Sequence, residues 1–208
     1  MNMVAKVDFS KRELIRKGWG KVKEHAHLLI KILLAFIGLS IVSSIINVAF
    51  EEVMAVALLA SIVVTIVQTV FEIGLIKIGL DIIENKKPNF KDLYSNYTLF
   101  LPFFLTSIIL GIIIIVGFIL LIIPGIYLAV RYQFTSFVIV DKKLSYWTAI
   151  KKAGELTKGR WMQIFLFDLA LIGLNLLGLL ALGIGLLLTI PTSFFASVYL
   201  YRRLASSN

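Results

Sequence analysis

Four charged residues stand inside long apolar runs, where a charge has few partners. Lys77 is expected to extend to the inner membrane surface. The other three are Glu72, Arg131 and Asp168, with Gln68 one helical turn before Glu72 and Gln133 two residues after Arg131. A charge near the bilayer centre costs at least about 2.5 to 3.5 kcal/mol unless it meets a partner or water. We therefore expect one polar cluster, in which Arg131 pairs with Glu72, Asp168 or both. It could hold three helices in register, relay an ion or proton, or bind an anionic headgroup at Arg131.

No other constellation in the sequence points to catalysis. The absence of cysteine excludes a thiol nucleophile, a thiolate metal site and a disulfide framework. His25 and His27 are two residues apart, and a helix would turn their rings to different sides. Phosphate loops, HExxH pairs and GxSxG elbows do not occur in the sequence. We therefore predict no catalytic residue, no metal and no cofactor, and we expect that the protein is not an enzyme.

The lysines and arginines indicate which ends of the apolar runs face the cytoplasm. Of the 21 such residues, 18 fall in segments 1–27, 81–98, 141–160 and 201–208. The short connections on the other side carry none. Basic connections of membrane proteins lie on the cytoplasmic side. The alternation therefore predicts a multi-pass membrane protein with both termini in the cytoplasm.

The lengths of the apolar runs predict an all-α fold, because about 20 apolar residues in a helix cross a bilayer. We expect a polytopic transmembrane helix bundle of six spans in three hairpins, forming a single membrane domain over residues 1–208. Outer turns are expected at Glu51-Glu52, at Pro124-Gly125 and at residues 183–185, and Pro191 is expected to kink the last span. The expected spans lie near 28–50, 53–80, 99–122, 126–140, 161–182 and 186–201.

Two basic segments have the pattern of short amphipathic helices at the cytoplasmic interface. In the N-terminal segment, Ser10 and Glu13 form a capping-box pattern ahead of apolar residues at helical spacing. A second segment, around Trp147, repeats this design. We predict that Trp19 and Trp147 lie at the inner membrane interface, where tryptophan is enriched. These helices could sense the lipid surface or orient the span that follows.

Weak internal similarity indicates three related units. Part of the second hairpin recurs in the third at an offset of 67 residues, where Ile123-Pro124, Ala129 and Tyr132 correspond to Ile190-Pro191, Ala196 and Tyr199. The two amphipathic segments are also similar, including Gly18 in the first and Gly154 in the second. Such repeats are common in membrane folds built from duplicated hairpins.

Several longer motifs resemble a known family. The stretch from Gly117 to Tyr132, GFILLIIPGIYLAVRY, is followed by Leu156-Thr157-Lys158-Gly159 before the fifth expected span. With Lys17-Gly18-Trp19, this pattern resembles uncharacterised bacterial and archaeal membrane proteins related to the membrane domain of glycerophosphoryl diester phosphodiesterases. The resemblance implies a six-helix integral protein of a prokaryotic plasma membrane, without an assigned reaction. The soluble phosphodiesterase domain has no counterpart in this sequence, so the resemblance does not carry that activity over.

The net charge of +9 indicates an anionic partner. Because the cations flank apolar spans, we expect anionic lipid headgroups of the inner leaflet as partners and no nucleic acid. A membrane-protein partner is the alternative. Our leading hypothesis is a non-enzymatic membrane protein that acts by associating with lipid or another membrane component. The alternatives are a small transporter that uses the polar cluster, and a lipid-modifying enzyme or its accessory subunit.

Overall fold

The computed structural model describes residues 9–49, 53–181 and 183–207, and the described chain is helical without a β-strand. This confirms the all-α prediction. The predicted Glu51-Glu52 turn lies outside the described residues. The helices are α1 (Lys11–Glu24), α2 (Ala26–Ala49), α3 (Met54–Ile83), α4 (Asp92–Ser95), the 3-10 helix η1 (Tyr97–Leu99), α5 (Phe100–Leu120), α6 (Ile122–Tyr132), α7 (Thr135–Lys142), α8 (Tyr146–Leu156), α9 (Trp161–Leu180) and α10 (Leu186–Ala205).

Five stretches of the described chain are long and apolar enough to cross a membrane, which supports a membrane protein. The sixth expected span, near 186–201, falls in α10, which is not among them. Hydroxyl side chains and the two arginines of its last turn make α10 less apolar. The five stretches are Ala26–Ile46, Ala55–Ile83, Asp92–Leu120, Ile122–Lys142 and Trp161–Leu180.

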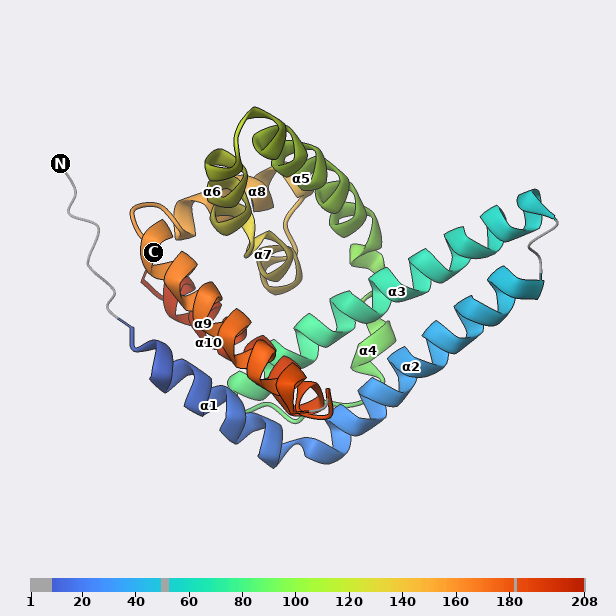
Figure 1. Cartoon of the computed structure of the whole chain (residues 1–208), viewed down its shortest axis with the longest axis horizontal. Coiled ribbons are helices and arrows are strands. Elements are labelled where there is room, and N and C mark those ends of the chain that lie inside the picture. Colours follow the sequence, from blue (N-terminus) through green and yellow to red (C-terminus); the bar gives the residue numbers. More distant parts are fainter. Residues whose placement is uncertain (1–8, 50–52, 182, 208) are drawn as a thin grey trace.

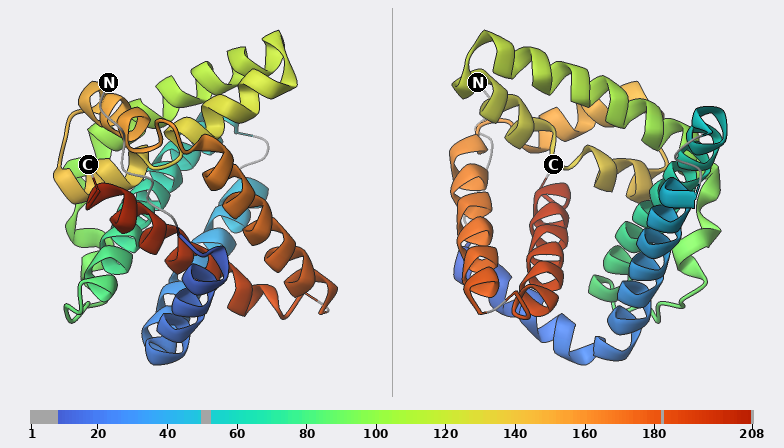
Figure 2. Two further views of the ribbon diagram at one scale, coloured as in Figure 1. Left: turned by 90° about the vertical axis from the view of Figure 1, so that its left-hand side faces the viewer. Right: turned by 45° about the vertical axis from the view of Figure 1, so that its right-hand side comes forward.

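The long helices form three hairpins, α2–α3, α5–α6 and α9–α10 (Figure 1). The α2–α3 hairpin extends away from the other two. The α5–α6 and α9–α10 connections lie at opposite ends of the molecule in Figure 1 and in both views of Figure 2. The hairpin tips therefore do not gather on one face, and six parallel crossings remain a prediction.

The turn expected at Pro124-Gly125 occurs three residues earlier in the sequence. The chain turns at Leu121, whose backbone is extended, and Pro124 and Gly125 lie in the first turn of α6. Proline fits there because the first N–H groups of a helix have no partner within it. The expected span 126–140 lies within the apolar stretch Ile122–Lys142, which is divided into two helices, since α6 ends at Tyr132 and α7 begins two residues after Gln133. Pro191 lies inside α10, as expected.

The connection between α9 and α10 lies where it was predicted. Helix α9 ends at Leu180 and α10 begins at Leu186. Between them, Gly183 has a φ of +75°, which glycine adopts without a steric penalty. The two backbones approach closely beside this turn, because an added Cβ at Gly185 would lie 2.6 Å from the carbonyl oxygen of Gly178.

A repeated packing relation supports the three-unit repeat. The short helix before each hairpin packs on another hairpin: α4 on α3, α8 on α5, α6 and α7, and α1 on α10. A glycine lies at each contact. Gly18 meets the backbone of α10, Gly74 of α3 meets the backbone of α4, and Gly154 of α8 meets the ring of Tyr132. The α1–α10 contact joins the first helix to the last one. With the other two contacts, it links the three hairpins into a closed ring.

The core surrounds α10, which packs against α1, α3 and α9. Phe195, Ala196, Val198, Leu200 and Tyr201 are fully buried. Burial of such side chains contributes about 1.5 to 3 kcal/mol each for the larger ones, so this helix anchors the described fold.

The N-terminal basic segment forms α1, and Ser10 caps it as predicted: the Ser10 hydroxyl accepts a hydrogen bond from the backbone N–H of Glu13 at 3.4 Å. Its buried residues Leu14, Gly18 and Val22 follow a four-residue spacing. This face therefore contacts protein, chiefly α10, and not lipid.

Candidate functional site

Of the five residues in the predicted polar cluster, the structure joins two. Gln133, between α6 and α7, donates a hydrogen bond from Nε2 to Oδ2 of Asp168 on α9 at 2.9 Å. Glu72 is exposed and Gln68 is half-buried on α3, and neither bonds to another cluster member within the described chain. The hydrogen bond links the α6–α7 break to α9.

The expected ion pair of Arg131 is wrong. Within the described residues Arg131 has no ion pair with Glu72 or Asp168; instead, its Nη1 donates to the hydroxyl of Tyr127 at 3.1 Å. Its guanidinium lies over the rings of Tyr127 and Tyr132, 5.8 and 5.6 Å from their centroids. Helical side chains lean toward the preceding turn, which brings Arg131 onto Tyr127, four residues earlier. Aromatic faces then serve as its partner.

The predicted interfacial tryptophans lie beside lysines. The Lys23 ammonium lies 5.0 Å from the Trp19 ring centroid, and the Lys151 ammonium lies 5.7 Å from that of Trp147. Trp19 is half-buried, whereas Trp147 is 54% exposed. Their location at a membrane interface stays a prediction.

An ionic network that the sequence analysis missed joins α3, α7 and α10. Arg202 on α10 pairs with Glu84, just after α3, and its Nη2 lies 2.9 Å from Oδ1 of Asp141 on α7. The hydroxyl of Tyr201 donates to Oδ2 of Asp141 at 2.8 Å. The Asp141 side chain is only 9% exposed, so its charge depends on these partners.

The network continues along the end of α3. Asp81 pairs with Lys77 at 2.5 Å and with Lys86 at 3.7 Å, and Lys86 also pairs with Glu84 at 2.5 Å. The charge pattern of the sequence indicated only a basic segment at residues 81–98 and no ionic network. The signal that could have revealed the network is the presence of acidic residues at the ends of apolar helices.

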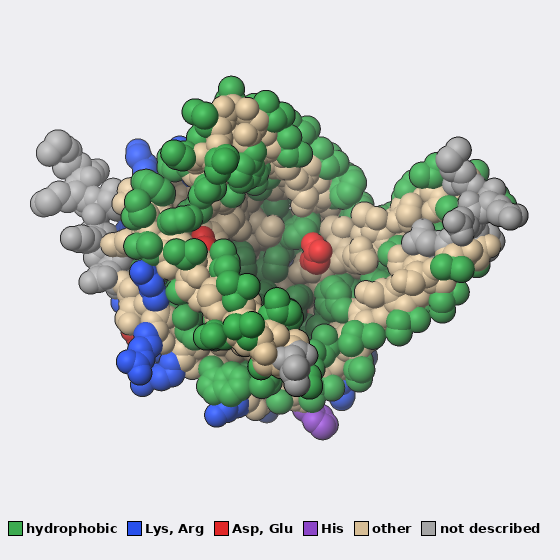
Figure 3. Space-filling model, in the orientation of Figure 1, with side chains coloured by type: hydrophobic (Ala, Val, Ile, Leu, Met, Phe, Trp, Pro, Cys, Tyr) green, Lys and Arg blue, Asp and Glu red, His purple; other side chains and the backbone are tan. Residues whose placement is uncertain are grey.

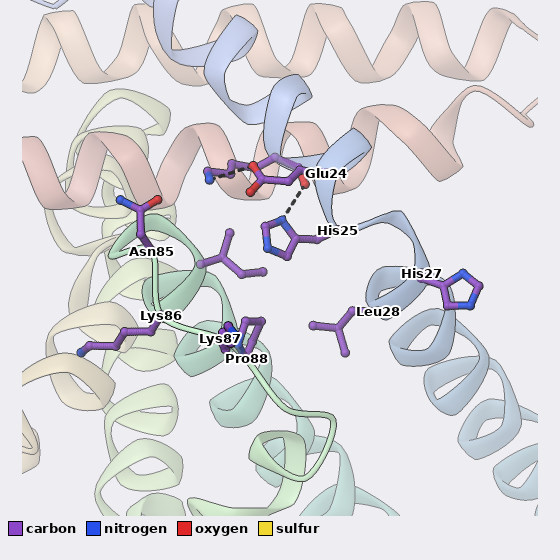
Figure 4. Close-up of a pocket in the computed structure, with 10 residues that line it drawn as sticks. Glu24, His25, His27, Leu28, Asn85, Lys86, Lys87 and Pro88 are labelled. Atoms are coloured by element: carbon purple, nitrogen blue, oxygen red, sulfur yellow. Dashed lines mark hydrogen bonds and ion pairs between the residues drawn. The ribbon is translucent and has the colours of Figure 1, made fainter.

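A recess of about 440 Å³ lies beside this network, between the α1–α2 corner and the turn after α3 (Figure 4). The two sides of the recess face each other, with His25 between them. From the corner it is lined by Lys21, Glu24, His25, His27 and Leu28, and from the other side by Ile82, Asn85, Lys86, Lys87 and Pro88.

Local structure sets the charges of the recess. The Lys21 ammonium donates to Oε2 of Glu24 at 2.8 Å, and this hydrogen bond lowers the pKa of the Glu24 carboxyl. Asn85 has a φ of +58°, a left-handed conformation that asparagine tolerates, and it turns the chain toward Lys87. Lys86 extends away toward its ion pairs (Figure 4). Lys87 makes no ion pair in the described part of the chain, so the recess keeps a surplus of positive charge.

The recess can hold an anion, because ammonium groups donate charge-assisted hydrogen bonds to phosphate or carboxylate oxygens. Leu28, Ile82 and Pro88 give it an apolar side. Sequence reasoning missed this site because its two halves lie about 60 residues apart and only the packing of α1 brings them together. The adjacent Lys86-Lys87-Pro88 was the available signal.

Comparison with known proteins gives one family match. Residues 107–208, from α5 to the last residue, match a family described as protein of unknown function (DUF975). The match covers just under half of the chain. No curated protein and no solved structure matches the chain. The C-terminal half is therefore similar to a family without an assigned reaction. The comparisons show no link to glycerophosphoryl diester phosphodiesterases.

Proposed function

We propose that this chain is an integral membrane protein that binds anionic lipid headgroups at the inner membrane face and catalyses no reaction. The recess between the α1–α2 corner and the turn after α3 carries this proposal. It combines lysines from two segments with an apolar side, as a headgroup at the boundary between water and hydrocarbon requires.

The proposed orientation follows the distribution of charge. Both termini and the basic connections face the cytoplasm of a prokaryotic cell, and the chain crosses the plasma membrane several times. Each lysine near an anionic leaflet contributes about 1 kcal/mol of attraction. The proposed kinship with membrane domains of glycerophosphoryl diester phosphodiesterases agrees with a role next to phospholipid, and it rests on the motifs around Pro124 and Gly159.

Charge complementarity supports the binding proposal. Lys21 is paired with Glu24, whose pKa its hydrogen bond lowers, whereas Lys87 has no ion pair within the described residues. The recess therefore offers at least one cation to an anionic headgroup.

A transport pathway is the second candidate, and one observation favours it. Glu72 is exposed on a helix whose other exposed residues are largely apolar. A carboxylate exposed on such a helix needs water or a mobile cation as its partner. Figure 3 also shows acidic side chains facing the hollow between the hairpins. Proton or cation leak through liposomes containing the purified protein, lost in Glu72→Gln, would support this candidate.

Headgroup binding is tested by native mass spectrometry of protein released from nanodiscs that contain phosphatidylglycerol and phosphatidylcholine. The double variant Lys21→Gln with Lys87→Gln removes two recess cations. We expect a loss of about 25-fold in retained phosphatidylglycerol relative to phosphatidylcholine, at about fivefold for each cation. The control Lys151→Gln with Lys158→Gln removes the same charge away from the recess.

The control variant should keep most of the wild-type preference for phosphatidylglycerol. Equal losses in the two double variants would mean that only total charge matters. No loss in either would mean that the recess binds no headgroup, and both outcomes contradict the proposal.

A further inference from the structure

A second depression lies on another side of α1. It is a groove of about 630 Å³ between α1 and the α9–α10 hairpin, which run side by side (Figures 1 and 2). Arg12, Arg16 and Trp19 line it from α1, and Leu177 and Leu188 line it from the hairpin. It shares no lining residue with the recess of the proposed function.

The two arginines at the groove form no ion pair with any residue that the structure describes. Arg12 and Arg16 are both exposed. The nearby carboxylate of Glu13 is already engaged, at 2.7 Å from Lys17 and 4.0 Å from Arg203. Like charges four residues apart on a helix destabilise each other. A bound anion between the two guanidinium groups would remove this repulsion.

The floor of the groove is apolar and is recessed relative to the side chains around it. Leu177 is 66% exposed and Leu188 is 48% exposed, so neither is covered by the protein. Gly178 and Gly185, at the close approach of α9 and α10, place no side chains in the groove. A slot of this kind accepts a flexible hydrocarbon chain, and the adjoining arginines match a negative charge at the end of that chain.

We infer that the groove binds one anionic phospholipid of the bilayer. Its phosphate lies between Arg12 and Arg16, and one acyl chain lies along Leu177 and Leu188 beside the Trp19 ring. The inference requires that α1 and the tip of the α9–α10 hairpin lie at the same membrane interface, because Arg12, Arg16 and Gly185 line one groove. This differs from the outer position expected for residues 183–185. The inference goes beyond the proposed function because it assigns a site for the acyl chain as well as for the headgroup.

Trp19 provides a reporter inside this site. Replacing the other two tryptophans, Trp147→Phe and Trp161→Phe, gives a protein with Trp19 as its single indole. It is reconstituted into phosphatidylcholine bilayers in which a fixed fraction of lipid carries brominated acyl chains, either on phosphatidylglycerol or on phosphatidylcholine. Bromine quenches an indole on contact, so quenching measures occupancy of the groove by each lipid.

We expect brominated phosphatidylglycerol to quench Trp19 with an apparent affinity about 25-fold higher than brominated phosphatidylcholine, at about fivefold for each guanidinium. Arg12→Gln with Arg16→Gln should abolish this difference. Both side chains are exposed, so the variant should keep its circular dichroism spectrum and its elution volume. The recess variant Lys21→Gln with Lys87→Gln should keep the difference, which separates failure of this inference from failure of the proposed function.

Three results would overturn the inference. Equal quenching by the two lipids in the wild-type background would exclude selective binding. Loss of selectivity in the recess variant as well as the arginine variant would assign it to general surface charge. Stronger quenching by a brominated fatty acid, with displacement of phosphatidylglycerol, would assign the groove to a single-chain amphiphile.

Discussion

The contact of α1 with α10 can be tested at one glycine. In Gly18→Ala, the new Cβ would lie 2.6 Å from the carbonyl oxygen of Thr192 and 3.0 Å from the backbone nitrogen of Ala196. Both are backbone atoms of α10, so no side-chain rotation can relieve the contact. Gly20 lies on the same helix and has no neighbour within 4 Å of the corresponding Cβ position. Gly20→Ala is therefore a matched control.

Two opposing terms set the magnitude. Glycine to alanine inside a helix favours the helix by about 1 kcal/mol, and this gain is common to both variants. Overpacking at Gly18 costs about 1 to 3 kcal/mol, because the two helices must separate. Gly20→Ala should therefore raise the free energy of unfolding by up to about 1 kcal/mol, whereas Gly18→Ala should leave it unchanged or lower it by up to about 2 kcal/mol.

The assay is reversible unfolding of the detergent-solubilised protein by sodium dodecyl sulfate in mixed micelles, followed by tryptophan fluorescence and circular dichroism. The difference between the two variants isolates the contact with α10, because the helix-propensity term cancels. Equal stabilisation by both substitutions would refute the packing of α1 on α10, and with it the ring of three related units.

Two further predictions concern charged groups. Arg202→Met and Asp141→Asn should each lower the free energy of unfolding by about 1 to 3 kcal/mol, with a coupling above about 0.5 kcal/mol in the double variant, whereas additive losses would contradict the pair. The hydrogen bond from Lys17 lowers the pKa of Glu13 below its ordinary value of 4.5. Its stabilisation is present above pH 4.5 and is lost as pH falls through the lowered pKa. The free energy of unfolding, measured against pH, should fall over this range, and Glu13→Gln should remove this part of the pH dependence.

The helices could be predicted from the sequence because apolar runs and basic connections alternate. The first expected span, 28–50, corresponds to α2 at Ala26–Ala49. The break at Gln133 was missed because the segment contains neither glycine nor proline. The available signal was the group of polar residues Arg131, Gln133, Thr135 and Ser136, which interrupts the apolar pattern. Pro124 was misleading because proline is compatible with the first turn of a helix as well as with a connection.

The candidate sites depended more on packing than on local pattern. The hydrogen bond between Gln133 and Asp168 joins two members of the predicted cluster, but the partner of Arg131 depended on the side-chain direction toward Tyr127. The recess and the groove lie where segments distant in sequence pack together. No periodicity in one segment reveals the residues that another segment brings beside it.

Cysteine accessibility tests the central claim, that the basic segments, two of which form the recess, lie at the cytoplasmic side of a membrane. The chain contains no cysteine, so single cysteines can be placed without further changes. Ser145→Cys and Ser206→Cys should react with a membrane-impermeant maleimide only after cells are permeabilised, whereas Glu51→Cys should react in intact cells. Labelling of Ser145→Cys or Ser206→Cys in intact cells would place the basic segments 141–160 or 201–208 outside, away from the anionic inner leaflet, and would contradict the account.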